Sequence, residues 1–307
     1  MPDVYDVIII GGGPAGLVAG LYSARARHST LLLERGILGG QIVNAALVEN
    51  YPGFAEGISG MELGERLHLH AAKYGLETLT AEAMGIEQKG QLKGVNTDQG
   101  LLMARTVIVA GGSEHRKLGA VGEKELLGRG VSYCATCDGP LFKDQMVAVV
   151  GGGDTALSDA LFLSQFAQRV TLVHRRDELR ASRILQERAQ AQPRINFVWD
   201  SVVDEVQGDS MVQGLRLRQV KTGESSTLVV GGVFVAVGLV PNTSYLEGVL
   251  RLDASGQIEA GDRLETDIPG VFAAGDIRHN SARQAIVAAG DGATAALSAT
   301  RFLQEQG

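Results

Sequence analysis

The feature that most restricts the fold of this 307-residue chain is an internal repeat. The segment VIIIGGGPAGLVAGLYSARARHSTLLLER begins at Val7, and VAVVGGGDTALSDALFLSQFAQRVTLVHR begins at Val147. They align without a gap, and each reads as a strand, a glycine turn, a helix and a second strand. Neither first strand alternates with polar residues, as expected for parallel strands buried on both faces. The repeat predicts two α/β units of similar design.

Each first strand ends in a glycine motif of the dinucleotide-binding type. The motif positions are Gly11, Gly13 and Gly16 (G-x-G-x-x-G) in the first copy and Gly151, Gly153 and Ala156 (G-x-G-x-x-A) in the second. A pyrophosphate must approach the backbone N–H groups at a helix N-terminus, where a Cβ would intrude and where the helix dipole favours an anion. One match alone could reflect purely structural glycines. Two matches, each followed by a second strand, favour two dinucleotide sites.

The two copies differ at the end of the second strand. Glu34 closes the first copy, and a carboxylate there accepts hydrogen bonds from a ribose 2′-hydroxyl and repels a 2′-phosphate. His174, Arg175 and Arg176 stand at and after the matching position, with Arg180 downstream. Guanidinium groups bind phosphate as a fork, so the second copy is expected to bind NADPH and the first FAD or NAD. The alternative is that the arginines belong to a solvated helix face.

Composition narrows the class of protein. The 41 glycines and the 5% of aromatic residues suit many tight βα turns, and the net charge of -7 argues against a general nucleic-acid binder. The N-terminal MPDVYDVIII does not resemble a signal peptide, and no apolar run approaches the ~18 residues of a membrane span. We therefore expect a cytoplasmic enzyme that binds neither nucleic acid nor membrane.

The only two cysteines are Cys134 and Cys137, in the segment SYCATCDG. A disulfide framework would scatter several cysteines, and a structural zinc site would need four ligands, so no metal site is expected. A C-x-x-C pair beside two nucleotide folds favours a redox centre over buried structural cysteines. Asp138 follows directly and could exchange a proton with a thiolate, although a surface or helix-capping aspartate is the alternative.

The order of motifs predicts a discontinuous first domain. Glycine-terminated strands recur at 106–112, 232–238 and 270–276, and the stretch from Phe197 to Val230 alternates as a β-meander. An Ala-rich helix is expected over roughly 282–303. We place the domain that binds the first nucleotide, FAD or NAD, at residues 1–114 and 244–307, and the NADPH-binding domain, with the C-x-x-C pair, at 115–243. The fold class is α/β, with two Rossmann-like (three-layer ββα) domains, one inserted into the other.

Together these motifs resemble the bacterial low-molecular-weight thioredoxin reductases. The resemblance runs nearly end to end, through GGGPAG, GGQI with ENYPGF, RGVSYCATCDG, GGGDTALSDAL, HRRDELRAS, VGLVPNT, and GVFAAGDIR with RQAIVAAGDGATAA. It implies a homodimeric flavoprotein that uses FAD and NADPH to reduce thioredoxin or a thioredoxin-like protein. It also implies that the inserted domain swings about hinges near residues 115 and 243.

The resemblance assigns roles to individual residues. The FAD contacts it implies are Gly11, Gly13, Pro14, Ala15, Gly16, Glu34, Arg35, Gly40, Gln41, Asn50, Gly275, Asp276, Arg283, Gln284 and Ala285. The NADPH contacts are Gly151, Gly153, Asp154, Thr155, Ala156, His174, Arg175, Arg176 and Arg180. The catalytic residues are Cys137, which faces the flavin, Cys134, which attacks thioredoxin, and Asp138, the acid/base.

The sequence departs from that family in two places. Ala110-Gly111-Gly112 stands where many members read Ala-Thr-Gly, and residues 44–47 replace a threonine-rich stretch near the flavin. The rival functions are a flavin-dependent dithiol oxidase, a reductase of another small disulfide protein, and a non-catalytic redox sensor that binds nucleotides. The arginine pair argues against the oxidase, and the intact C-x-x-C beside Asp138 argues against the sensor.

Overall fold

The chain forms two compact units in the computed structural model, which describes residues 4–45 and 47–306 apart from the side chain of Cys137. Unit 1 comprises the described parts of 1–114 and 240–307, and unit 2 comprises 115–239. The segments that cross between them, β7 (Ser113–His115) and β16 (Leu239–Pro241), pair as a two-stranded sheet. The chain thus returns to unit 1 at Val240, a few residues before the boundary that the sequence suggests.

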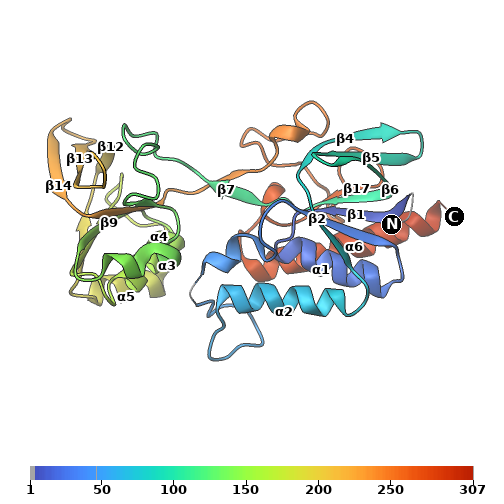
Figure 1. The fold of residues 1–307 in the computed structure, drawn as a ribbon, viewed down its shortest axis with the longest axis horizontal. Coiled ribbons are helices and arrows are strands. Elements are labelled where there is room, and N and C mark those ends of the chain that lie inside the picture. Colours follow the sequence, from blue (N-terminus) through green and yellow to red (C-terminus); the bar gives the residue numbers. More distant parts are fainter. Residues whose placement is uncertain (1–3, 46, 307) are drawn as a thin grey trace. The chain divides into compact units, whose positions relative to one another are not determined.

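Unit 1 is built on a seven-stranded sheet with helices on one side (Figure 1). In spatial order the strands are β3 (Glu77–Thr80), β2 (Thr30–Glu34), β1 (Tyr5–Ile10), β6 (Gly100–Val109), β5 (Leu92–Thr97) and β4 (Ala83–Lys89), with β17 (Val271–Ala273) also paired to β6. The helices are α1 (Pro14–Arg25), α2 (Gly60–Ala72) and α6 (Ala285–Glu305), with short 3-10 helices η1 (Gly40–Asn44), η3 (Ser244–Leu246) and η4 (Gly275–Ile277). Strands β3, β2, β1, β6 and β17 are parallel, so their carboxyl ends lie at one edge.

Alternate residues of β1 enter two different cores. Val7 and Ile9 pack with apolar residues of α1 and α6. Ile8 and Ile10 pack on the opposite face, with residues of β4, β5 and η3. Because side chains alternate between the faces of a strand, a sheet covered on both sides requires an unbroken apolar run. This burial explains why the repeat shows no polar alternation.

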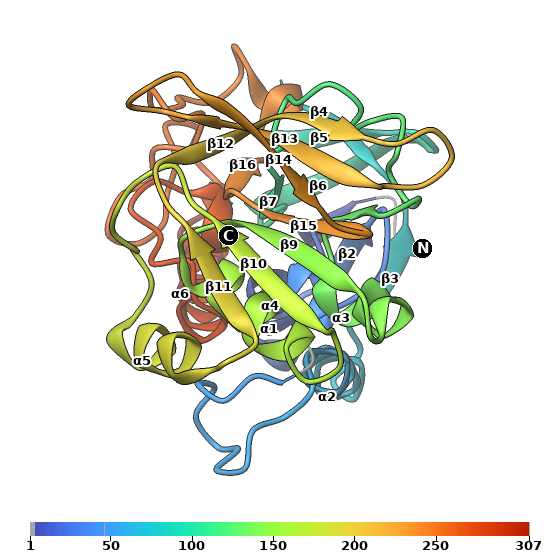
Figure 2. The same cartoon turned by 90° about the vertical axis from the view of Figure 1, so that its left-hand side faces the viewer.

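Unit 2 repeats this design around a five-stranded parallel sheet. Its order is β11 (Ile195–Val198), β10 (Arg169–Val173), β9 (Met146–Gly151), β15 (Gly232–Ala236) and β8 (Val131–Ser132). The helices are α3 (Ala135–Asp138), η2 (Gly139–Phe142), α4 (Asp154–Leu163) and α5 (Arg183–Ala191). A second, antiparallel sheet of β12 (Ser201–Gln207), β13 (Gly214–Gln219) and β14 (Ser225–Val229) covers the face opposite α4 and α5 (Figure 2). The unit therefore has three layers.

The predicted α/β class with two Rossmann-like units is confirmed, and two details of the sequence analysis change. The predicted meander begins too early, because Phe197 and Val198 belong to β11 of the parallel sheet, and the antiparallel strands span 201–229. The Ala-rich helix begins at Ala285 instead of about residue 282. Arg283, two residues before this helix, has a left-handed φ of 54°, which a continuing helix would not permit.

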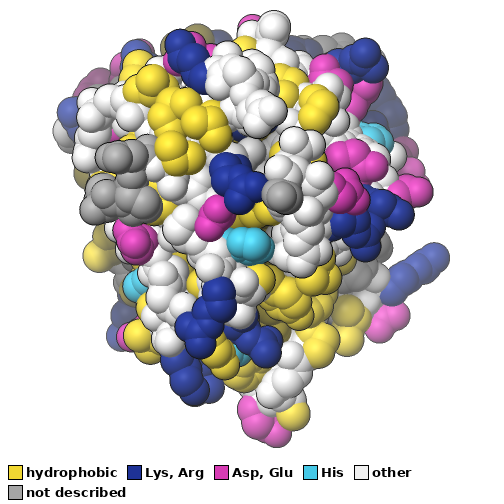
Figure 3. Space-filling view, turned by 90° about the vertical axis from the view of Figure 1, so that its right-hand side faces the viewer, with side chains coloured by type: hydrophobic (Ala, Val, Ile, Leu, Met, Phe, Trp, Pro, Cys, Tyr) yellow, Lys and Arg dark blue, Asp and Glu magenta, His cyan; other side chains and the backbone are white. Residues whose placement is uncertain are grey.

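The surface of unit 1 mixes both signs of charge. On the face that Figure 3 shows, Lys and Arg side chains lie among Asp and Glu side chains, with hydrophobic side chains between them. Over residues 4–45 and 47–306, no helix has both the length and the apolar character that crossing a bilayer requires.

Candidate functional site

The first and third glycines of the unit 1 motif are required by contacts within the chain. Gly11 has a φ of +107°, and a Cβ there would lie 2.4 Å from the carbonyl oxygen of Ala110. A Cβ at Gly16 would lie 1.8 Å from the carbonyl oxygen of Gly11. These glycines allow β1 to turn directly into α1, with the helix close against the strand end.

The middle glycine of each motif has no such internal reason. Gly13 caps α1 with an extended backbone (φ -75°, ψ -175°), and the nearest atoms to a Cβ there would be 4.0 Å away. Gly153 caps α4 with φ -102° and ψ -177°, and a Cβ there would meet nothing within 4 Å. Any residue adopts these angles. A missing Cβ over an open helix N-terminus therefore fits the approach of a pyrophosphate, which needs that space.

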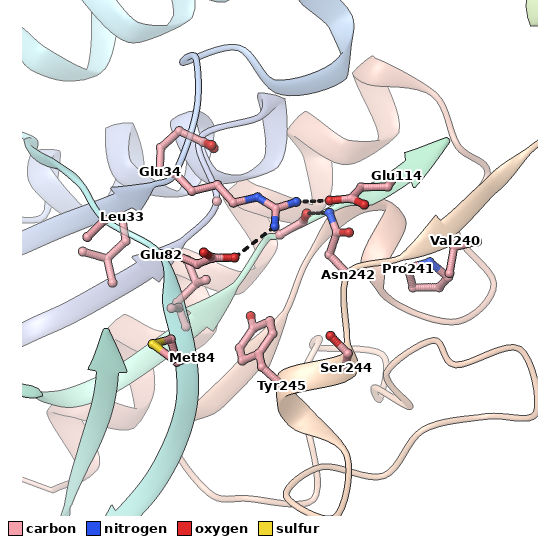
Figure 4. Close-up of a pocket in the computed structure, with 16 residues that line it drawn as sticks. Leu33, Glu34, Glu82, Met84, Glu114, Val240, Pro241, Asn242, Ser244 and Tyr245 are labelled. Carbon is pink, nitrogen blue, oxygen red and sulfur yellow. Dashed lines mark hydrogen bonds and ion pairs between the residues drawn. The ribbon is translucent and has the colours of Figure 1, made fainter. Parts of the chain in front are cut away.

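Glu34 joins the end of β2 to the glycine turn. Its Oε2 accepts the Gly12 N–H at 2.7 Å, and its Oε1 accepts the Gly36 N–H at 2.8 Å. Two main-chain donors thus fix the carboxylate beside the motif. Glu34 and Gly11 both line a cavity of about 630 Å³, and Figure 4 shows Glu34 in it.

The same cavity contains a charged bridge. Arg35 pairs with Glu82 at 3.1 Å and with Glu114, and these ion pairs are the dashed lines beside Glu82 and Glu114 in Figure 4. All three side chains are about half exposed, so the bridge lies at the rim of the cavity. Sequence reasoning named Arg35 but not its two carboxylate partners, which come from distant strand ends.

The remaining predicted FAD residues cluster around the start of α1, outside the lining of that cavity. Gly40 touches Gly13, since a Cβ on Gly40 would lie 2.9 Å from the Gly13 Cα. Gly275 lies against Ala15, with a corresponding separation of 3.0 Å. Pro14 is the first residue of α1. The C-terminal segment of unit 1 therefore lies beside the N-terminal glycine motif, as a shared site requires.

Side-chain hydrogen bonds connect predicted FAD residues from the N-terminal and the C-terminal parts of unit 1. The Asn50 Nδ2 donates to the Gln284 Oε1 at 3.0 Å, across 234 residues of sequence. Asp276 accepts the Ser281 hydroxyl at 3.0 Å, and burial raises the pKa of Asp276. Gln41 accepts from the Asn44 amide at 3.2 Å. Gln284 is the N-cap of α6 and Ala285 its first residue, so the α6 N-terminus begins at this site.

In unit 2 the glycine turn carries a histidine and three exposed arginines. The His174 ring packs on Gly152, where a Cβ would lie only 2.3 Å from it. The Arg180 N–H donates to the Gly152 carbonyl at 2.8 Å, which holds that residue at the turn. Arg175, Arg176 and Arg180 are solvent-exposed and form none of the ion pairs found among the described residues. Free guanidinium groups at the end of β10 suit an anionic ligand.

His174 is buried, whereas the three arginines are exposed. Burial lowers its pKa, with the positive charge of Arg180 acting in the same direction. Its Nε2 has no hydrogen-bond partner among the residues the structure describes. The ring therefore favours its neutral form and is better suited to shaping the turn than to acting as a fourth cation.

The other predicted residues of this turn lie in the first turn of α4. Asp154 is its first residue, and its Oδ1 accepts the Ser182 N–H at 2.6 Å, so Asp154 ties the helix start to the segment before α5. Thr155 is exposed, and Ala156 is fully buried at the position that matches Gly16. Gly151, with φ +156°, would place a Cβ 2.3 Å from the Ala236 carbonyl oxygen.

Cys134 lies between β8 and α3 and takes part in a disulfide. Its N–H donates to the Ser132 hydroxyl at 3.0 Å, and its carbonyl accepts the Asp138 N–H at 3.2 Å. Cys137 belongs to α3, but its side chain lies outside the described part of the structure. Asp138 is the N-cap of η2 without a side-chain capping bond, so capping does not account for its carboxyl group.

Sequence reasoning missed Asp159, an acid on α4, which packs against α3. Burial raises its pKa to about 7. The helical period of the sequence could have indicated this burial, since Asp159 lies three residues after buried Ala156 and four before buried Leu163.

Within the described parts of the chain, no group of three or more His, Cys, Asp or Glu side chains is arranged to hold a metal ion.

Comparison with known proteins agrees with this arrangement. Residues 5–292 match the family model for pyridine nucleotide-disulphide oxidoreductases. A thioredoxin reductase of Streptomyces coelicolor is 51% identical over 99% of this chain and 95% of its own. A bifunctional thioredoxin reductase/thioredoxin of Mycobacterium leprae is 48% identical over 98% of this chain and 66% of its own.

The likeness extends to solved structures. The crystal structure of Lactococcus lactis thioredoxin reductase aligns with a TM-score of 0.95 and 46% identity, over 98% of this chain and 99% of its own. On fold, motif geometry and similarity along almost its full length, the chain belongs to the pyridine nucleotide-disulphide oxidoreductase family and, within it, to the thioredoxin reductases.

Proposed function

We propose that this chain is an NADPH-dependent thioredoxin-disulfide reductase that holds FAD in unit 1 and NADPH in unit 2. The observation that carries the proposal is the contrast between matched positions of the two units. Glu34 is a carboxylate fixed beside one glycine turn, whereas Arg175 and Arg176 are exposed cations beside the other. The disulfide at Cys134 lies in the same chain as both sites.

In unit 1, open Gly13 and the α1 N-terminus would receive the FAD pyrophosphate, and Glu34 would accept the adenosine ribose hydroxyls. Asn50, Asp276, Arg283, Gln284 and Ala285 would hold the flavin half. When bound, FAD accepts a hydride from NADPH and delivers the electron pair to the enzyme disulfide. Gly40 packs on Gly13 and adds no side chain beside this turn.

In unit 2, Gly153 and the α4 N-terminus would receive the NADPH pyrophosphate. Arg175, Arg176 and Arg180 would bind the ribose 2′-phosphate, because charge-assisted bonds to a phosphate fork are among the strongest available to a protein. Neutral His174 would support the turn from beneath through its contact with Gly152.

The dithiol formed when this disulfide is reduced then passes the electron pair to thioredoxin. In this proposal the Cys134 thiolate attacks the thioredoxin disulfide, a mixed disulfide forms, and Cys137 displaces reduced thioredoxin as the enzyme disulfide re-forms. Asp138 exchanges the proton with the thiol pair. Overall, NADPH and one proton reduce one disulfide to a dithiol. The Mycobacterium leprae relative, whose name joins a reductase to thioredoxin, supports this choice of partner.

We also propose a homodimer. Apolar side chains are exposed on all three long helices of unit 1, at Tyr22 of α1, Leu69 of α2 and Leu297 of α6. Single exposed apolar side chains are ordinary on protein surfaces, so the proposal rests on the resemblance to the homodimeric family and these side chains are only compatible with it. Light scattering of the purified chain measures its mass directly, and a monomer at micromolar concentration would contradict this part of the proposal.

The test of the whole proposal is anaerobic titration of the FAD-loaded chain with NADPH, followed by coupled reduction of a disulfide dye through thioredoxin. We expect NADPH to bleach the flavin and thioredoxin to accelerate dye reduction. Without bleaching, the proposed electron donor is wrong. Bleaching without acceleration by any thioredoxin would leave a reductase of another disulfide protein. Oxygen consumption with small dithiols, without reduction by NADPH, would instead identify a dithiol oxidase.

A further inference from the structure

Asp291 is a buried carboxylate in α6. Only 8% of the residue is exposed, and the residue after it packs directly on α1, since a Cβ on Gly292 would lie 2.1 Å from the Ala15 carbonyl oxygen. A buried charge is costly unless hydrogen bonds and an opposite charge compensate for the lost water. The charge of Asp291 therefore has to be explained by the groups that it contacts.

Asp291 binds both ends of the short helix η4. Its Oδ2 accepts the Gly275 N–H at 3.0 Å and the Arg278 Nε–H at 2.7 Å, and its Oδ1 accepts the Arg278 Nη2 at 2.9 Å. Gly275 begins η4, and Arg278 follows its last residue. Two parallel bonds from one guanidinium give an ion pair both strength and a defined orientation. The carboxylate thus holds η4 to α6 at two points.

This ion pair is more buried than the others that the structure describes. Its side chains are 17% and 11% exposed, whereas each of the other ion pairs described has at least one side chain that is 39% exposed or more. The Arg278 Nη1 also donates to the His279 carbonyl at 3.0 Å. Exposed pairs contribute little, but breaking a buried pair leaves an uncompensated charge in the core. These contacts therefore hold the segment around η4 in place.

Asp276 lies between the two points at which η4 is held, and it is one of the residues expected to contact the flavin half of FAD. Gly275 in turn lies against α1, where a Cβ on Gly275 would be 3.0 Å from the Ala15 Cβ. We propose that Asp291 and Arg278 are positioning residues for FAD, because by holding η4 against α6 they place the Asp276 carboxyl group where it meets the flavin half. This inference rests on the proposed function, since it assumes that unit 1 holds FAD with Asp276 at that half.

The charges of the pair also act on Asp276. Burial raises the pKa of Asp276, the negative charge of Asp291 acts in the same direction, and the positive charge of Arg278 opposes it. The pair therefore fixes η4 with two charges that oppose one another at Asp276. Replacing one partner by a neutral residue leaves the other charge acting alone, so the two partners are tested by different kinds of substitution.

The test uses variants of the full-length chain, freed of FAD and titrated with FAD and, separately, with ADP, which carries the adenosine half without the flavin. Asp291→Asn keeps the shape of the side chain but loses the charge that binds Arg278. We expect its dissociation constant for FAD to rise by about 10- to 100-fold, as when a charge-assisted hydrogen bond is lost, while the constant for ADP changes little. An unchanged FAD constant, or equal factors for FAD and ADP, would overturn the inference.

A second variant and a control accompany this test. Arg278→Lys keeps the positive charge beside Asp291 but cannot form the fork, so the FAD constant should rise by a smaller factor, again without a change for ADP. This variant decides the question if Asp291→Asn does not fold. Tyr5→Phe removes a buried hydrogen bond of 3.1 Å to Glu77 at the end of β1 that is opposite to the glycine turn. It should lower the melting temperature and leave both constants unchanged, and a rise of the FAD constant alone in this control would overturn the inference.

A double variant separates positioning from a general structural role. If Asp291 acts through Asp276, adding Asp291→Asn to Asp276→Ala should leave the FAD constant of Asp276→Ala unchanged, whereas independent effects would multiply. Multiplied effects would therefore overturn the inference. Arg278→Lys takes the place of Asp291→Asn in the double variant if the latter does not fold.

The outcomes also separate this inference from the proposed function. A wild-type chain that does not bind FAD would overturn both together. If Asp276→Ala left FAD binding unchanged, the flavin contact assigned to Asp276 would be wrong, and the inference with it. If Asp276→Ala weakened FAD binding and neither Asp291→Asn nor Arg278→Lys did, the positioning role alone would be wrong.

Discussion

The two glycine turns share their spacing, but they differ at the third position. In unit 1 a Cβ at Gly16 would lie 1.8 Å from a backbone oxygen, whereas unit 2 carries a Cβ at the matching Ala156. The turn backbones differ accordingly, with φ +107° at Gly11 and +156° at Gly151. The turn of unit 2 accommodates this methyl group, which is fully buried. Although the two motifs have the same spacing, the turn of unit 1 cannot accommodate a Cβ at its third position and the turn of unit 2 can.

The same comparison separates glycines required by packing from glycines required by a ligand. A Cβ at Gly11, Gly16 or Gly151 would collide with protein atoms, whereas a Cβ at Gly13 or Gly153 would meet no atom closer than 4.0 Å. A packing glycine affects the free energy of unfolding, while a ligand-facing glycine affects binding. Substitutions at the two kinds of glycine should therefore change different measurements.

The largest effect is expected from Gly16→Ala with Gly13→Ala as its matched control. The first change forces a methyl group against a backbone oxygen and should lower the free energy of unfolding by about 3 kcal/mol or more. The second should lower it by about 1 kcal/mol or less, since only a helix N-cap changes from glycine to alanine, yet it should weaken FAD binding. Denaturant unfolding with and without FAD measures both effects. Similar destabilisation by the two changes would contradict the division of roles.

The next effect concerns pH and compares Asp159 with Asp154 on the same helix. Because burial raises the pKa of Asp159 to about 7 from 3.8, the folded chain retains a proton that the unfolded chain releases. Stability should therefore fall as pH rises from about 4 to 7, by on the order of 2 to 4 kcal/mol at most. Asp159→Asn should remove this loss, and Asp154→Asn should keep it. Unfolding curves between pH 4 and 8 provide the measurement. If the free energy of unfolding of Asp159→Asn still fell with pH as it does in wild type, the prediction would be wrong.

A third prediction sharpens the contrast between Glu34 and the arginines. The double change Arg175→Ala and Arg176→Ala should raise the KM for NADPH by about 10- to 100-fold, because charge-assisted bonds to the phosphate are lost. The KM for NADH, which lacks that phosphate, should change little. Arg183→Ala, an exposed arginine at the start of α5, is the control. Steady-state kinetics with both nucleotides provides the measurement. If the KM values for NADPH and NADH rose by the same factor, the two arginines would not bind the 2′-phosphate.

Sequence alone predicted the features that depend on local pattern. The two glycine turns, the buried strands and the contrasting residues Glu34 and Arg175 are all visible in the repeat, because strand burial and turn geometry impose residue types at fixed spacing. The features it missed depend on long-range proximity. The pairing of Arg35 with Glu114 and that of Arg278 with Asp291 bring together residues from different elements of the fold. His174 was placed correctly at the turn, but its burial beneath Gly152 was not evident.

The smallest effect should come from the bridge at the rim of the unit 1 cavity. Glu82→Gln removes one ion-pair partner of Arg35, and because both side chains are about half exposed, the free energy of unfolding should change by no more than about 1 kcal/mol. The change should become smaller still at high salt, which screens exposed pairs. Unfolding measured at low and high ionic strength tests this, with Glu87→Gln, which removes the exposed partner of Lys89, as the control. If Glu82→Gln lowered the free energy of unfolding several times more than Glu87→Gln, and salt did not change this loss, the prediction would be wrong. The bridge between Arg35 and Glu82 would then be a structural part of the cavity, as the glycine turn is.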